Sequence, residues 1–517
     1  MKEFNIGSAK KKIEGKTFYF HDYETFGINP MLSQATQFAG IRTDEDLNII
    51  EGTELNIYCK VRDDQLPSPM ACIVTNLTPK RIETKESSVL FSEYDFTKRV
   101  MKEMSYPNTC NIGYNNINFD DEWSRNLSYR NFLDPYEREW KNGCSRADGI
   151  NFIQAVWIYN PNILNFPQAK DKETGELLFD KNNKPLPSFK LEDLSAANGI
   201  IHENAHDALS DVIALIGLLK IIKEKDSFLF NYVLSLKDKN KVSQDLFNYK
   251  ESMKPFLHIS SFYGKKNNSS SVAVVIGKDK ANKNQFIVFD LKEDPEKLLL
   301  DANLIRDNIF SKSGELDEKG ESRIGLKTIA INKCANYLDL SLIKNRAEDL
   351  GLSKNSNLYK ENLIKLKEIM SRVDIQAKLD LIYESKYEKP TDPDISIYGG
   401  FPSKKDVSLK ETVNFYLTSN NLDGLGAVNF DDSRLNELLI RFKARNFPES
   451  LNQAEKKYWS SFVRGKLFDE IYSAEYSYSQ FIEEIDDLKL EFKDNEDVLL
   501  ILDELLEYSE KIKLKYK

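Results

Sequence analysis

The stretch FYFHDYETFG, residues 18–27, is predicted to form a strand that carries two carboxylates. Strand side chains alternate between two faces, so Phe20, Asp22 and Glu24 share one side. Burying two unpaired neighbouring carboxylates is costly, and a divalent cation removes that cost by binding both. Oxygen ligands favour Mg²⁺ or Mn²⁺ over zinc. The alternative interpretation is an exposed strand end with two solvated acids.

Length and composition set broad limits. The 517 residues are 41% hydrophobic, enough for two or three domains with separate cores. Five cysteines, an odd number without a CxxC pair, argue against a disulfide framework or structural zinc. Apolar runs are too short to span a bilayer and the first residues lack a secretion signal, so we expect a cytoplasmic protein without membrane association. The net charge of -10 argues mildly against nucleic-acid binding. Net charge is a sum over the whole chain, however, and a local basic groove is sufficient to bind a nucleic acid.

The sequence pattern changes along the chain. Strand-like and helical runs alternate up to about residue 225, which indicates an α/β domain with a polar surface insertion at 168–187. SVAVVIG (271–277) and QFIVFDL (285–291) predict a hairpin, and GLKTIAINK a further strand. The prolines of EKPTDPD, 388–394, mark a boundary. Beyond it the chain is charged and helical, and Val498, Leu502, Leu505 and Leu506 form one apolar stripe.

A second acidic segment is GYNNINFDDE, residues 113–122. Its asparagines suggest a turn before a helix that begins near Asp120. An acid at a helix N-terminus is also ordinary capping chemistry, and Asp121 or Glu122 could serve that role equally well.

A third acid lies in NAHDALSDV, residues 204–212. The helix that follows is apolar nearly all round, so we expect it to be buried. Asp211 has no basic residue within four positions, and metal is its natural partner. Asp207 can turn to the helix end, and His206 lies at the helix mouth. A stray histidine is more often structural or solvated than catalytic.

Taken together and in this order, the three acidic segments resemble the DEDD-type 3′→5′ exonucleases whose third motif is H-x4-D. The similarity to bacterial exonuclease I extends along the chain. It is carried by the motifs above, by PSFKLEDLSAANGI (187–200), INKC (331–334), YGGF (398–401) and RFKARNFP (441–448).

The resemblance implies a fold and an activity. An N-terminal extension (1–15) would precede an α/β RNase H-like exonuclease domain (16–225), an SH3-like α+β domain (226–390) and a C-terminal helical domain (391–517). The implied activity is processive 3′→5′ degradation of single-stranded DNA to 5′-mononucleotides by two Mg²⁺ ions, which Mn²⁺ can replace, in DNA repair and recombination. We expect a monomer.

The resemblance also assigns roles to residues. Asp22 would bridge two metals, Glu24 and Asp211 would complete the first metal site, and Asp120 would serve the second. His206 would be the general base, acting on the attacking water. Substrate contacts would come from Glu24, Thr25, Phe26 and Asn116.

Two further contacts are expected. Basic and aromatic neighbours suit single strands, and Phe262, Tyr263, Lys265 and Lys266 are candidate nucleic-acid contacts, although a solvated loop is the alternative. The family also binds the acidic, apolar C-terminal tail of the single-stranded-DNA-binding protein through a basic patch. Relatives carry a basic residue where this chain has Asn160 before Pro161.

Two other functions stay open. A 3′→5′ exoribonuclease could use the same four acids and histidine, but such enzymes tend to be short single-domain chains. An inactive binding module on the exonuclease scaffold is the second alternative, and the presence of all four acids and His206 argues against it.

Overall fold

The computed structural model describes residues 15–171, 174–180, 183–200, 207–312, 316, 322–384 and 390–517. It contains two compact units. The first comprises Met1–Ser145, His202–Ile213 and Glu388–Lys517, and the second comprises Arg146–Ile201 and Ala214–Tyr387. The domain boundaries expected at 225 and 390 stay predictions.

The first unit is built on a mixed sheet with the strand order β4-β3-β2-β1-β5. Strand β1 lies near its centre, antiparallel to β2 and parallel to β5. These strands are β1 (Thr17–Thr25), β2 (Ala35–Thr43), β3 (Leu55–Cys59), β4 (Leu90–Phe91) and β5 (Thr109–Gly113), and β6 (Ser145–Asp148) follows where the units meet in sequence.

The two faces of β1 differ in chemistry. Tyr19 and Tyr23 pack with Phe96 of helix α3 and Trp123 of helix α4, which forms one layer of the core. The opposite face carries Phe18, Phe20, Asp22 and Glu24. The predicted strand is therefore confirmed, and its acids occupy one face. The helices of this part are α1 (Pro69–Thr75), α2 (Pro79–Glu83), α3 (Glu93–Met104), α4 (Asp120–Arg130) and α5 (Glu137–Trp140).

Helix α8 (Ala208–Lys225) carries the third acid. Val212, Leu215 and Leu219 are buried, as the sequence predicts. The expectation of an apolar helix buried nearly all round is wrong at Ile213, which is 42% exposed. Ile213 is two positions after Asp211, about 200° around the helix, so the exposed side chain and the acid point in different directions.

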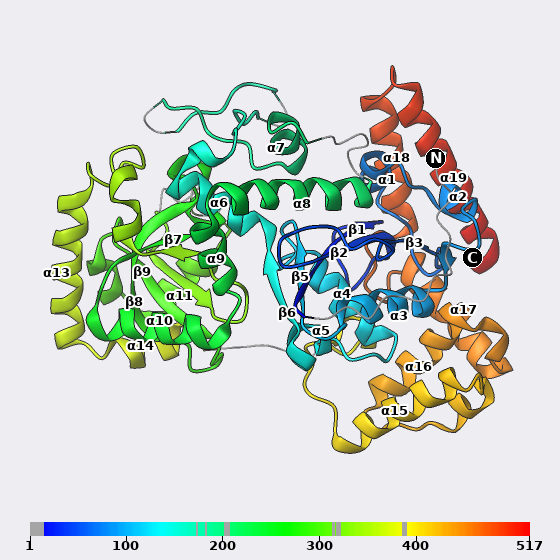
Figure 1. Ribbon diagram of the computed structural model, residues 1–517. Coiled ribbons are helices and arrows are strands. Elements are labelled where there is room, and N and C mark those ends of the chain that lie inside the picture. Colours follow the sequence, from blue (N-terminus) through cyan, green and yellow to red (C-terminus); the bar gives the residue numbers. More distant parts are fainter. Residues whose placement is uncertain are drawn as a thin grey trace. The chain divides into compact units, whose positions relative to one another are not determined.

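The C-terminal helices share a core with residues from the start of the chain. Figure 1 shows α18 and α19 (red) beside α1 and α2 (blue), which lie far from them in sequence. Val498, Leu502 and Leu505 of α19 are buried there with Cys72 and Ile82, so the predicted stripe is confirmed. These helices are α15 (Lys404–Thr418), α16 (Ser433–Asn446), α17 (Gln453–Leu467), α18 (Tyr478–Glu491) and α19 (Glu496–Tyr516).

A buried ionic network reinforces this association. Asp64 accepts hydrogen bonds from Arg445 at 2.8 Å and from Lys466 at 3.3 Å. Burial alone would raise the pKa of Asp64, but Arg445, Arg62 and Lys466 together hold that pKa far below its usual range. A buried carboxylate held by several cations depends on all of them, so α16 and α17 help to stabilise the segment after β3.

The second unit is built on an antiparallel sheet with the order β10-β9-β8-β7-β11. The predicted hairpin is confirmed as β8 and β9, and the predicted further strand as β10. The strands are β7 (Phe256–Ile259), β8 (Ser270–Lys278), β9 (Gln285–Asp290), β10 (Leu326–Ala330) and β11 (Tyr337–Leu338). The helices are α6 (Gly149–Tyr159), α7 (Leu191–Ala197), α9 (Ser227–Ser235), α10 (Lys239–Ser252), α11 (Ala302–Phe310), α13 (Ser356–Arg372) and α14 (Ile375–Ile382).

Two cores lie on the two faces of this sheet. One face packs against apolar residues of α11, α13 and α14. The other packs Phe256, Val275, Val288 and Ile329 against α10. All five cysteines of the chain are buried. Within the described part of the chain, no helix combines the length and the apolar character needed to cross a membrane.

Candidate active site

Three carboxylates converge on the acidic face of β1. Asp22, Glu24 and Asp211 each offer an oxygen, and these oxygens lie within 4.8 Å of one another. Glu24 is buried, while Asp22 and Asp211 are half-buried. The strand places its two acids on one face, and the first turns of α8 bring Asp211 to them. The structure therefore brings together three of the four acids predicted as metal ligands in a set suited to a divalent cation.

Burial and mutual repulsion act on these acids together. Burial raises the pKa of Asp22 well above its usual range, and its acidic neighbours, Asp120 first, raise it further. Burial also raises the pKa of Glu24, with Asp211 the largest electrostatic contributor. A cluster that resists ionisation in this way favours a cation, because the cation compensates several negative charges at once.

The fourth acid, Asp120, is the first residue of α4 and acts electrostatically on Asp22. It is 1% exposed, and its carboxylate accepts a hydrogen bond from the backbone N–H of Tyr23 at 3.1 Å. Pairing between β1 and β5 ends at Phe20, so Tyr23 lies beyond the ladder and Asp120 supplies its acceptor. Asp120 is thus held against the acidic strand.

Asp121 points elsewhere. Its carboxylate pairs with Arg138 at 2.7 Å, and both side chains are fully buried. Adjacent helical positions point about 100° apart, which separates Asp121 from the acids of β1. The preference for Asp120 over Asp121 as the metal ligand stays a prediction, and this geometry supports it.

Asp207 precedes Asp211 by one helical turn and has partners of its own. Its carboxylate accepts a hydrogen bond from Gln37 of β2 at 2.9 Å and another from the backbone N–H of Ser210 at 3.4 Å. Gln37, 2% exposed, was not predicted as a site residue. Its partner Asp207 lies 170 positions away, so no local pattern in the sequence marked Gln37. His206, the predicted general base, lies outside the described residues.

The expected substrate contacts are placed as follows. Thr25 donates to the carbonyl of Gly27 at 2.7 Å. Phe26 is fully buried within the core shared with the C-terminal helices. Asn116 is also fully buried, and its side-chain amide has no hydrogen-bond partner among the described residues. Contact of these three residues with substrate stays a prediction.

The loop after β1 is held by a glutamate from the C-terminal part of the chain. Glu475 accepts a hydrogen bond from the backbone N–H of Ile28 at 3.2 Å. A Cβ added at Gly27 would lie 2.6 Å from the Glu475 carboxyl carbon. Gly27 therefore allows this carboxylate to approach the backbone that leaves the acidic strand.

The chain is similar in sequence to known exonucleases. Family models match for "Exonuclease" over residues 19–219, "Exonuclease I SH3-like domain" over 237–385 and "Exonuclease I C-terminal domain" over 391–512. Exodeoxyribonuclease I of Haemophilus influenzae is 35% identical over 500 residues, which cover 96% of this chain and 98% of that protein. The Escherichia coli protein of the same name is 33% identical with the same coverage.

The chain belongs to the exonuclease I family. Among solved structures, E. coli exonuclease I with single-stranded DNA and zinc has a TM-score of 0.84 at 31% identity, and the match covers 96% of this chain and 100% of that one. Exonuclease I from Methylocaldum szegediense gives the same TM-score and coverage at 33% identity. The predicted RNase H-like, SH3-like and helical parts are confirmed, and the protein is a nuclease.

The candidate DNA contacts of this exonuclease I chain lie between β7 and β8. Phe262 is 81% exposed, and Lys265 is also exposed. Tyr263 is buried, with its hydroxyl 2.9 Å from His258 Nδ1. The side chain of Lys266 lies outside the described part of the structure. All four contacts stay predictions.

Asp120 and Asp121 lie in different environments, and this difference leads to a prediction. Asp120→Asn should lower DNA cleavage more than about 100-fold while leaving the fold intact, because an amide oxygen can still accept from Tyr23. Asp121→Asn should instead lower the free energy of unfolding by about 3 kcal/mol, because Arg138 loses its buried partner. Cleavage assays and urea unfolding on both variants test this. Greater loss of cleavage in folded Asp121→Asn would reverse the assignment.

The close approach of the Glu475 carboxylate to Gly27 leads to a second prediction. Gly27→Ala should lower cleavage by about 10-fold or more, because the new methyl displaces Glu475 and the loop beyond the acidic strand. Gly426→Ala is the control, since its Cβ would meet nothing within 4 Å. In a double-mutant cycle, Gly27→Ala should add little to Glu475→Ala. Fully additive losses would show that the two residues act independently.

Proposed function

We propose that this chain degrades single-stranded DNA processively from its 3′ end, releases 5′-mononucleotides, and acts as a monomer in DNA repair and recombination. The observation that carries the proposal is the convergence of Asp22, Glu24 and Asp211 on one strand face. Family membership supports it, and the E. coli relative has been solved with single-stranded DNA.

The donor set fits divalent cations. Hard carboxylate oxygens suit Mg²⁺, which Mn²⁺ can replace. Burial first, and neighbouring carboxylates second, raise the pKa values of Asp22 and Glu24, and a cation would offset both effects. Asp22 would bridge two ions, with Glu24 and Asp211 on the first and Asp120 on the second. When bound, such ions neutralise the phosphate, activate water and stabilise the leaving oxygen.

The protein groups have separate tasks in this scheme. β1 and α8 fix the acids before substrate arrives, so little reorganisation is needed. Asp207 is one helical turn before Asp211, and its hydrogen bond from Gln37 fixes the start of α8 relative to β2. His206 would accept the proton of the attacking water, since an imidazole titrates near neutral pH. Glu24, Thr25, Phe26 and Asn116 would position the terminal nucleotide.

The same chemistry could cut RNA. The family relationship favours DNA, because the matched curated relatives are exodeoxyribonucleases. Cleavage of matched DNA and RNA oligonucleotides, labelled at either end, discriminates between the two substrates. Absence of cleavage in Mg²⁺ with intact binding would favour the inactive scaffold.

Removal of the bridging acid tests the metal scheme. Asp22→Ala should lower cleavage of single-stranded DNA by more than about 100-fold. In EDTA the same variant should melt about 2 °C higher than the wild type, because acid–acid repulsion is relieved. Asp46→Ala, at an exposed acid in the turn after β2, is the matched control. Near wild-type cleavage by Asp22→Ala would contradict the bridging role.

We also propose that the acidic, apolar tail of the single-stranded-DNA-binding protein docks on the second unit. A cavity of about 330 Å³ supports this, since its lining includes Leu340, Ile343 and Leu363 together with Lys344 and Lys360. Both lysines are exposed. Apolar tail side chains would enter the cavity, and the lysines would pair with the acids.

Charge reversal tests this docking site. The double variant Lys344→Glu/Lys360→Glu should bind a synthetic tail peptide about 10-fold or more weakly than the wild type, because two attractions become repulsions. Lys280→Glu/Lys283→Glu, on the exposed β8–β9 turn, makes the same change in net charge elsewhere. Equal weakening in both variants, measured by fluorescence anisotropy, would contradict a specific site.

A further inference from the structure

One face of the second unit's sheet changes character along its strands. Near α10 this face is apolar and buried. Further along, the same face carries His258, Ser271, Asp290 and Lys327, as the strand register requires: His258 pairs with Ser271, and Val288 pairs with Lys327. The polar end of this sheet face therefore offers charged and hydrogen-bonding groups to a ligand.

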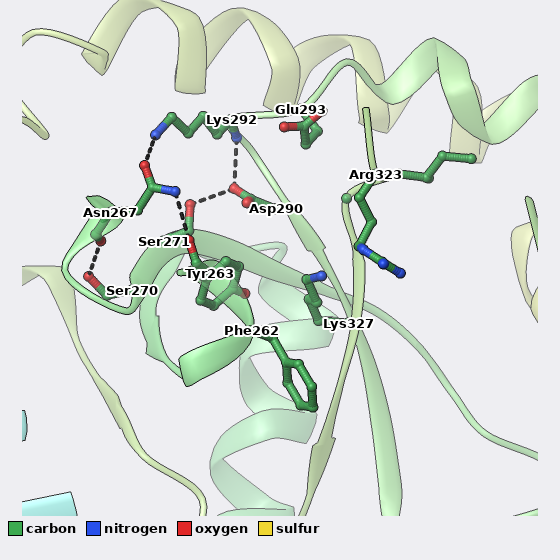
Figure 2. A pocket seen from close by; sticks show the side chains of 12 residues that line it. Phe262, Tyr263, Asn267, Ser270, Ser271, Asp290, Lys292, Glu293, Arg323 and Lys327 are labelled. Atoms are coloured by element: carbon green, nitrogen blue, oxygen red, sulfur yellow. Dashed lines mark hydrogen bonds between the residues drawn. The ribbon is translucent and has the colours of Figure 1, made fainter. Parts of the chain in front are cut away.

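A pocket of about 220 Å³ lies at this polar end. Figure 2 shows its lining, with Phe262, Lys327 and Arg323 toward one side and Lys292 and Asn267 toward the other. Gly325 lines it as well and adds no side chain. The pocket is therefore lined by cations, by two carboxylates, by hydroxyl and amide groups, and by the rings of Phe262 and Tyr263.

Most charged groups of this pocket already have partners. Asp290 accepts from the Ser271 hydroxyl at 2.5 Å and from the Lys292 backbone N–H at 2.9 Å. Arg323 donates to the carbonyls of Ile309 and Ser311, both at 2.7 Å. The acid and the guanidinium are thus occupied by the protein itself.

Lys327 differs from them. Among the described residues, its ammonium makes no hydrogen bond and no ion pair within 4.0 Å. Burial lowers the pKa of Lys327, and the positive charge of Arg323 lowers it further, with Asp290 and Glu293 opposing. Glu293 is itself paired with Lys297 at 3.1 Å. An anion beside Lys327 would supply the missing partner and compensate its charge.

Phe262 provides the second feature. It belongs to a short 3-10 helix, Ser261–Tyr263, that Tyr263 anchors through His258. Its ring is 81% exposed at the edge of the pocket, although burying it would be favourable. An exposed ring beside a cation matches a nucleotide, whose base stacks while its phosphate pairs.

We propose that this pocket binds one nucleotide unit of single-stranded DNA, with a phosphodiester on Lys327 and a base stacked on Phe262. The single unpaired ammonium matches the single charge of a diester. The dianionic phosphate of a free mononucleotide would meet the nearby Asp290 and Glu293 with less compensation. This inference rests on the proposed function and extends it to residues outside the acid cluster.

The test uses the full-length protein in EDTA, so that binding is measured without cleavage. A labelled thirty-nucleotide oligothymidylate is titrated by anisotropy at several salt concentrations. Lys327→Gln should weaken binding about 3- to 10-fold and reduce the slope of log affinity against log salt by about 0.7. Phe262→Ala should weaken binding about 5-fold or more without changing that slope.

The matched control is Lys283→Gln, which removes an exposed lysine from the β8–β9 turn of the same sheet and should leave affinity and slope unchanged. Thermal unfolding confirms that each variant is folded. Variants at Lys327 and Phe262 that bind like the wild type would overturn the inference alone. Thymidine 5′-monophosphate that competes at the strand's own concentration would also overturn it, by assigning the pocket to free nucleotide. A wild-type protein that neither binds nor cleaves the strand would overturn the proposed function and this inference together.

Discussion

Repulsion between carboxylates confined to one face of a central strand is the constraint on which the catalytic half of this molecule depends. Asp22 and Glu24 are two residues apart on β1, and α8 adds Asp211. Pairing with β2 fixes the backbone of Asp22 and Glu24, and the first turn of α8 fixes Asp211. Burial raises the pKa values of Asp22 and Glu24 most, and repulsion from the neighbouring carboxylates raises them further. Sites arranged in this way are stable when occupied by cations, which connects metal binding to stability as well as to chemistry.

The C-terminal helices contribute to this confinement. They complete the core around Phe26, the residue that follows β1, and Glu475 holds the backbone of the same loop. Arg445 and Lys466 of α16 and α17 hold Asp64, in the segment after β3. The helical part is therefore not an appendage to an independent nuclease sheet. Its packing keeps in place the backbone that presents the acids.

Local patterns in the sequence were sufficient for the elements and for the acids. Strand-like runs bounded by turn residues predicted β1, the β8–β9 hairpin and β10, and the turn before Asp120 predicted where α4 begins. Gln37 and Glu475 could not be found in this way, because each matters through a partner distant in sequence. Lys327 could not be found either, because only the fold places its ammonium in the pocket beside Phe262. Phe26 shows that a residue marked by a motif can also have a role in packing. Motif position suggested contact with substrate, whereas packing of residues more than 400 positions away decides that its ring is buried in this structure.

Catalysis by a cluster of carboxylates and binding of a DNA strand make opposite electrostatic demands. The acid cluster repels a phosphate backbone until cations neutralise it, and the chain as a whole carries a net charge of -10. Affinity for a polyanion must then come from sites where cations remain available. Many lysines and arginines of the described residues are already paired, as Arg138, Arg445 and Lys466 are. A partly buried lysine without a partner, such as Lys327, is therefore more informative about strand binding than the total charge. Under this division, substitutions in the acid cluster act mainly on the chemical step, whereas substitutions at cations and rings elsewhere act mainly on affinity and its salt dependence.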